Sequence, residues 1–98
     1  MRPFKKVKNI HFVGIGGAGM IGIAKVLLQK GYRISGSDIS DSNDLQRLRR
    51  DGAQVYIGHS TKNIKGANLL VVSSAINKNN PELIQAKKDS ITAIPRAE

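Results

Sequence analysis

A glycine-rich turn, set between a short apolar run and a helical pattern, constrains the fold of this chain more than any other feature. The apolar run Ile10–Val13 indicates a buried parallel strand. Gly14, Gly16 and Gly19 follow it and fit the spacing G-x-G-x-x-G, in which the glycines permit a tight turn, close approach to a phosphate and close helix packing. Unpaired N–H groups and the positive end of the helix dipole favour an anion there. The alternative interpretation is a flexible turn that binds no ligand.

Strands and helices alternate along the rest of the chain. Apolar runs bounded by glycine and polar residues predict five strands, over residues 10–13, 32–37, 53–57, 69–72 and 91–94. Helical spacing and start signals predict a largely buried helix over 19–30, a second helix after the capping residues 40–43, and a third that begins at Asn80. This alternation predicts one α/β domain, residues 1–98, with a Rossmann-like, doubly wound parallel sheet of five strands in the order 3-2-1-4-5.

Composition limits the classes of function. Ninety-eight residues form one domain, which is small for a whole enzyme, and without cysteine there is neither a disulfide nor a thiolate metal site. The net charge of +9 fits either a nucleic-acid binder or part of a larger protein whose acidic residues lie elsewhere. The 16 Lys and Arg are scattered, with small clusters only at Lys5-Lys6 and at Arg47, Arg49 and Arg50, which we expect on a solvated helix face. Because no aromatic platform accompanies them, we expect no nucleic-acid partner.

The sequence contains no recognisable set of catalytic groups. A carboxylate pair, a metal-ligand cluster, a nucleophile–base set and the pattern G-x-x-x-x-G-K-[ST] are all absent, so we expect no catalytic residue, metal site or ATP site in this stretch. His11, Lys25 and several glycines interrupt the apolar stretch near the N-terminus, which argues against a signal peptide or membrane span. The residues alone therefore predict a nucleotide or dinucleotide binder, with NAD and a nucleotide sugar equally compatible.

Residues that follow each predicted strand are the candidate ligand contacts, because ligands of open parallel sheets lie beyond the carboxyl ends of the strands. Asp38 is positioned either to bind a ribose hydroxyl or to cap the following turn. His59 is positioned to meet a base or a phosphate, although a histidine in a polar loop is more often solvated. Ser73 and Ser74 either bind a phosphate or sugar or cap the strand exit.

The glycine turn and the strand ends together resemble the Mur ligases. The resemblance runs in chain order through His11–Met20, Gly22–Ala24, Gly36–Asp38, Gly58-His59, Val71–Ile76, Asn80–Glu82 and Ile94–Glu98. The doubled glycine with its leading histidine is far more specific than G-x-G-x-x-G alone. Ile21 departs from the pattern, since the family usually has serine there.

The resemblance implies the first domain of a three-domain cytoplasmic ligase of peptidoglycan synthesis, and hence of cell shape and division. In such an enzyme the first domain holds UDP-N-acetylmuramate, the central domain binds ATP and Mg²⁺, and the third helps to bind L-alanine. ATP phosphorylates the muramyl carboxylate, and the alanine amine attacks the acyl phosphate to form the amide. We therefore expect residues 1–98 to bind the sugar nucleotide, to bind no cofactor of their own, and to be inactive alone.

The resemblance also assigns the predicted site residues to parts of this ligand. We expect the diphosphate over the glycine loop, at Gly14, Gly16, Gly17, Ala18, Gly19 and Met20. The uridine is expected at Ser37, Asp38 and His59, and the diphosphate and sugar at Ser73, Ser74, Ala75 and Ile76. The rival hypothesis is a nicotinamide-dinucleotide-binding module of an oxidoreductase, supported by the glycine loop and Asp38.

Overall fold

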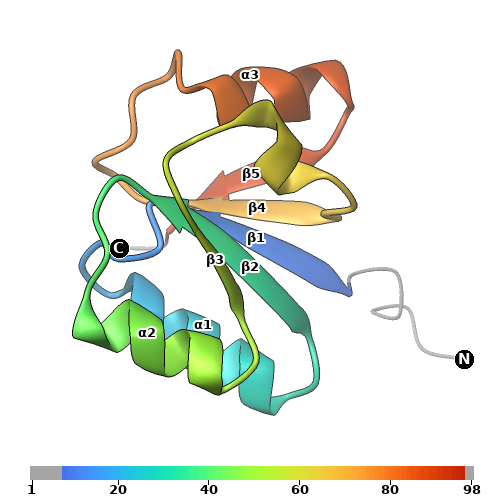
Figure 1. Ribbon diagram of the computed structural model, residues 1–98. Coiled ribbons are helices and arrows are strands. Elements are labelled where there is room, and N and C mark those ends of the chain that lie inside the picture. The colour runs from blue at the N-terminus through green and yellow to red at the C-terminus, as the bar shows by residue number, and fades with distance from the viewer. Residues whose placement is uncertain (1–7, 97–98) are drawn as a thin grey trace, which may run out of the picture.

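The computed structural model describes residues 8–96, which form an open sheet of five parallel strands (Figure 1). The strands are β1 (Asn9–Val13), β2 (Arg33–Asp38), β3 (Gln54–Ile57), β4 (Leu69–Val72) and β5 (Thr92–Pro95). Their order across the sheet is β3-β2-β1-β4-β5, which confirms the predicted order. The predicted features at Lys5-Lys6, Ala97 and Glu98 lie outside the described residues.

The three central strands end at one edge of the sheet. Val13 at the end of β1 is paired with Ser37 of β2 on one side and with Val72 of β4 on the other. Because all pairs are parallel, the segments that leave these strands emerge side by side. Beside β1 the connections diverge, one towards β2 and the other towards β4, which makes this edge the switch point of a doubly wound sheet.

Helices cover both faces of the sheet (Figure 1). They are α1 (Met20–Gln29), α2 (Asn43–Arg50), the 3₁₀ helix η2 (Thr61–Ile64) and α3 (Pro81–Lys88). α1 and α2 lie on one face, whereas η2 and α3 lie on the other. Side chains alternate along a strand, so Ile10 and Phe12 of β1 pack towards α1 and α2, while Val13 packs towards η2 and α3.

Two apolar clusters hold these layers together. The larger joins Met20 and Ala24 of α1 and Leu45 and Leu48 of α2 to the sheet, and the smaller joins Ile64 of η2 and Ala86 of α3 to it. Burying one such leucine stabilises the fold by about 1.5–3 kcal/mol. The helices therefore hold the central strands, and with them the switch point, in place.

One local expectation was wrong. α1 is only partly buried, because a helix on the outside of a sheet hides one face; Val26 is 51% exposed. Between β3 and β4 the chain forms η2, which begins after Ser60, whose hydroxyl accepts from the amide of Lys62. The capping predictions are confirmed, because Ser42 Oγ accepts from the amide of Leu45 at the start of α2, and Asn80 Oδ1 accepts from that of Glu82 at the start of α3.

Candidate functional site

A hollow of about 400 Å³ lies beyond the carboxyl ends of the central strands. It is lined by the loop after β1, by the last residue of β2 and by residues that follow β2, β3 and β4, namely Gly14, Gly16, Gly17, Asp38, Ile39, His59, Ser73, Ala75, Ile76, Asn77 and Asn80. A second hollow, of about 380 Å³, lies near the amino ends of β1 and β2. Because ligands of open parallel sheets bind at the carboxyl ends, the first hollow is the candidate site.

Gly14 makes the tight turn with which the chain leaves β1. Its φ of 80° lies in the left-handed region that favours glycine. Its N–H donates to the carbonyl oxygen of Ser37 at 2.8 Å, which ties the turn to the end of β2. A methyl group on Gly14 would lie 2.9 Å from Cβ of Ser73, so the loop also lies against the residue that follows β4.

Gly16 and Asp38 are joined by a hydrogen bond that the sequence did not predict. The N–H of Gly16 donates to Asp38 Oδ2 at 2.8 Å, and the amide of Ser40 donates to Asp38 Oδ1 at 3.3 Å. The expectation of a bare Gly16 amide was therefore wrong, while the turn-capping interpretation of Asp38 is confirmed. A Cβ atom on Gly16 would lie 2.9 Å from Asp38 Oδ2, so a side chain here would displace the carboxylate.

Backbone donors without a partner lie at the start of α1. The amides of Gly17 and Met20 are satisfied inside the turn. Those of Ala18, Gly19 and Ile21 have no hydrogen-bond partner among residues 8–96. α1 also has no capping side chain and no acidic residue in its first turn, so this end presents free donors and the positive end of a helix dipole.

The guanidinium group of Arg96 lies against the same helix end. A Cβ atom on Gly19 would lie 2.9 Å from Arg96 Nη1 and 3.1 Å from its Cζ. The amide of Arg96 donates to the carbonyl oxygen of Val72 at 2.9 Å, so the sheet fixes the backbone from which this side chain extends. Sequence reasoning included Arg96 only in the resemblance, because no local pattern relates the end of β5 to the glycine loop.

The remaining predicted residues divide into those that line the hollow and those that do not. Ser73 is buried, lines the hollow with Ala75 and Ile76, and accepts a hydrogen bond from the amide of Ala75 at 3.3 Å, as a capping residue does. Five predicted residues are outside the lining, namely Ala18, Gly19, Met20, Ser37 and Ser74. Met20 is fully buried in the core and Ser37 lies fully buried beneath His59, whereas Ser74 is exposed.

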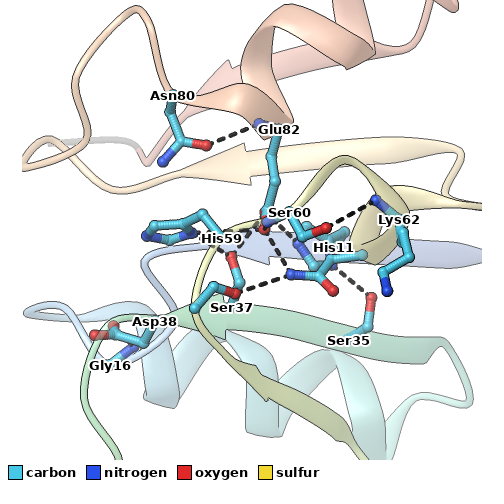
Figure 2. Close-up of polar contacts among 12 residues, drawn as sticks. His11, Gly16, Ser35, Ser37, Asp38, His59, Ser60, Lys62, Asn80 and Glu82 are labelled. Carbon is cyan, nitrogen blue, oxygen red and sulfur yellow. Dashed lines mark hydrogen bonds and ion pairs between the residues drawn. The ribbon is translucent and has the colours of Figure 1, made fainter.

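A buried carboxylate, Glu82, is the centre of a polar network that the sequence did not reveal (Figure 2). Its Oε1 accepts hydrogen bonds from His11 Nε2 and Ser37 Oγ, each at 2.7 Å. Its Oε2 accepts from the amide of Ser60 at 3.0 Å and from Asn63 Nδ2 at 2.9 Å. Sequence analysis included Glu82 only in the resemblance, next to the predicted helix start at Asn80.

These donors determine the ionisation of Glu82. Burial by itself raises the pKa of a carboxyl group, but hydrogen bonds from His11, Ser37 and Asn63 outweigh it and lower the pKa of Glu82 from 4.5 to about 2. The group is therefore a carboxylate at neutral pH and acts only as an acceptor. It ties α3 to β1, β2 and η2 through charge-assisted hydrogen bonds.

His59 is held above this carboxylate and is not a solvated side chain. Its Nδ1 lies 2.8 Å from Ser37 Oγ and 3.5 Å from Glu82 Oε2, and the side chain is 14% exposed. The ring also lines the hollow. His59 is thus the link between the buried network and the candidate site.

Among residues 8–96, no group of three or more His, Cys, Asp or Glu side chains is arranged to hold a metal ion. In the same part of the chain, no helix has the length and apolar character that a membrane crossing requires.

An open parallel sheet with a glycine turn at its switch point and a hollow beyond the strand ends defines a Rossmann-like nucleotide-binding domain. Residues 9–98 match the family model described as "Mur ligase family, catalytic domain". The chain therefore belongs to the Mur ligase family.

Individual relatives cover nearly the whole chain. A UDP-N-acetylmuramate–L-alanine ligase of Legionella pneumophila (strain Corby) is 60% identical over 92 residues, which are 94% of this chain and 20% of that protein. The enzyme of the same name from Sulfurihydrogenibium sp. (strain YO3AOP1) is 54% identical over 93 residues, 95% of this chain and 20% of that protein. The crystal structure of the UDP-N-acetylmuramate–alanine ligase from Thermotoga maritima matches with a TM-score of 0.85 and 32% identity, over 90% of this chain and 20% of that one. This chain spans about one fifth of the length of these relatives.

Proposed function

We propose that this chain is the UDP-N-acetylmuramate-binding domain of a ligase that joins L-alanine to the muramyl carboxylate in peptidoglycan synthesis. The observation that carries the proposal is the 60% identity, over 94% of the chain, to a relative of that name. A hollow of about 400 Å³ at the carboxyl ends of the strands supports it, because pockets of small-molecule ligands fall in this size range.

The chemistry of the hollow supports a particular orientation of the ligand. Next to the hollow, at the start of α1, the amides of Ala18, Gly19 and Ile21 and the guanidinium of Arg96 supply donors and positive charge for the diphosphate. Asp38 and His59 lie on the other side of the glycine loop, where we propose the uridine. We propose that the sugar lies along the residues after β4, where Ala75 and Ile76 line the hollow.

The residues of this chain do not fit the ATP and Mg²⁺ that such a ligase needs for phosphoryl transfer. Residues 8–96 hold no candidate metal cluster, and the sequence has no phosphate-binding lysine motif. We propose that ATP, Mg²⁺ and L-alanine bind in the part of the ligase that this chain does not span. On this proposal the chain binds and orients one substrate in a cytoplasmic enzyme and carries out no chemical step.

The rival function is a nicotinamide-dinucleotide-binding module, which rests on the glycine loop and Asp38. Titration calorimetry of the 98-residue chain with UDP-N-acetylmuramate, UDP and NAD separates the two. We expect both uridine compounds to bind and NAD not to bind. Binding of NAD without binding of either uridine compound would overturn the proposal.

Arg96 offers a test of the ligand's orientation. Arg96→Gln should weaken UDP binding by about tenfold or more, because it removes a charge-assisted contact worth about 1.5–3 kcal/mol. Arg47→Gln is the matched control, since that side chain is 61% exposed on α2 and pairs with Asp44 instead of lying against Gly19. Equal affinities of the two variants would contradict the diphosphate placement.

A further inference from the structure

His59, which lines the hollow, is hydrogen-bonded to Ser37, and the hydroxyl group of Ser37 carries a single hydrogen. Ser37 Oγ donates that hydrogen to Glu82 Oε1 at 2.7 Å, because a carboxylate can only accept. The hydroxyl of Ser37 is then an acceptor towards His59 Nδ1, 2.8 Å away. His59 must therefore carry a hydrogen on Nδ1. The approach of this nitrogen to Glu82 Oε2, at 3.5 Å, favours the same arrangement, because a lone pair there would face a carboxylate.

The other nitrogen of His59 is left without a partner. The two ring nitrogens point in different directions, and Nε2 has no hydrogen-bond partner among residues 8–96. In the neutral ring, a hydrogen on Nδ1 leaves Nε2 as a bare acceptor. The side chain lines the hollow, so this acceptor is available to a ligand.

We propose that the buried Glu82, acting through Ser37, fixes His59 as the Nδ1–H tautomer, so that Nε2 accepts a hydrogen bond from an uncharged donor of the nucleoside. This proposal rests on the proposed function and deepens it. A diphosphate offers only acceptors and would meet a lone pair at this position, so the nucleoside end of the ligand lies at His59. The donor is an N–H or O–H group, supplied by the imide of uracil or by a ribose hydroxyl. Glu82 and Ser37 are positioning residues, because both are fully buried and neither lines the hollow.

The same network assigns the opposite tautomer to the other histidine of the chain. His11 Nε2 lies 2.7 Å from Glu82 Oε1 and must donate to it, and Nδ1 of the neutral ring then accepts from Ser35 Oγ at 2.8 Å. The sequence contains two histidines, so a nitrogen NMR spectrum of the chain has one internal reference for each form.

The first experiment is that spectrum, recorded on the ¹⁵N-labelled 98-residue chain at pH 8, with His59→Gln used to assign the signals. We expect His59 to be protonated on Nδ1 and His11 on Nε2, and the His59 Nε2 signal to move when UDP is added. A His59 ring protonated on Nε2 would overturn the inference. This measurement needs no variant of Glu82 to fold.

The second experiment titrates the chain with UDP, N3-methyl-UDP and 2′,3′-dideoxy-UDP. The analogue that lacks the donor to His59 Nε2 should bind about tenfold more weakly than UDP, because this nitrogen is then left unpaired. The analogue that is affected shows whether the donor is the imide or a ribose hydroxyl. Ser37→Ala should reduce this discrimination, because only the 3.5 Å approach to Glu82 then favours a hydrogen on Nδ1. Ser35→Ala is the matched control, since it removes a hydroxyl from the same strand that contacts His11 instead.

The two proposals fail in different ways. If none of the uridine compounds binds to the wild-type chain, the proposed function is overturned, and the ligand part of this inference with it. If UDP binds and both analogues bind equally well, only the inference is overturned. If Ser37→Ala and Ser35→Ala discriminate alike, the positioning role of Ser37 is overturned.

Discussion

Acidification should destabilise this domain through Glu82. The pKa of this group is about 2 in the folded chain and has an ordinary value of 4.5, so the folded state binds its proton less readily than the unfolded state. The resulting stabilisation is complete above about pH 5 and is lost as the pH falls towards 2. A tenfold change in an equilibrium constant is worth about 1.4 kcal/mol, so the full contribution is about 3 kcal/mol, of which about 2 kcal/mol is lost by pH 3.

Urea unfolding between pH 7 and pH 3 at constant ionic strength measures this loss. Glu82→Gln should be less stable than the wild type at pH 7, because an amide leaves some of the buried donors unpaired. Its further loss between pH 7 and pH 3 should be smaller than that of the wild type by about 2 kcal/mol.

Asp44→Asn is the control for this comparison, because its side chain is 65% exposed on α2 and forms a 3.6 Å surface ion pair with Arg47. This variant should lose the same stability on acidification as the wild type. If Glu82→Gln also lost as much as the wild type, the reasoning about the buried network would be refuted. If Glu82→Gln does not fold, a wild-type free energy of unfolding that stays constant from pH 5 to pH 3 would refute it equally.

Two further predictions concern stability. Gly36→Ala should destabilise the domain by about 1–3 kcal/mol, because the new Cβ atom would lie 2.7 Å from Cβ of the fully buried Ile15. Gly22→Ala should stabilise α1 by up to about 1 kcal/mol, because its new Cβ atom would have no neighbour within 4 Å and alanine favours a helix more than glycine does. Thermal unfolding of the two variants checks both signs, and equal melting temperatures would contradict the packing argument. Ser42→Ala should cost about 1 kcal/mol through loss of the cap on the amide of Leu45, as urea unfolding would show, and an unchanged midpoint would mean that this cap contributes nothing.

The architecture was predictable because it depends on local patterns. Apolar runs of four or five residues, glycine turns and the cap at Asn80 each act over a few neighbouring residues, and the right-handed crossover rule then gives the strand order. The position of the candidate site was predictable for the same reason, because the carboxyl ends of parallel strands meet at one edge of the sheet. Gly14, Asp38, His59 and Ser73 were predicted in this way and line the hollow.

The polar contacts inside that boundary were not predictable from local pattern. His11 and Glu82 are 71 positions apart, and no spacing rule connects them. The spacing of 22 between Gly16 and Asp38 predicted a ribose contact for Asp38, not the hydrogen bond that joins the two residues. Glu82 has the same signature as any acidic residue in the first turn of a helix, and only the packing of α3 on the sheet buries it. The sequence by itself therefore determined the strand order and the edge at which ligands meet the chain. The tertiary structure decided which donors and acceptors remain free there, because burial and pairing depend on contacts between distant segments.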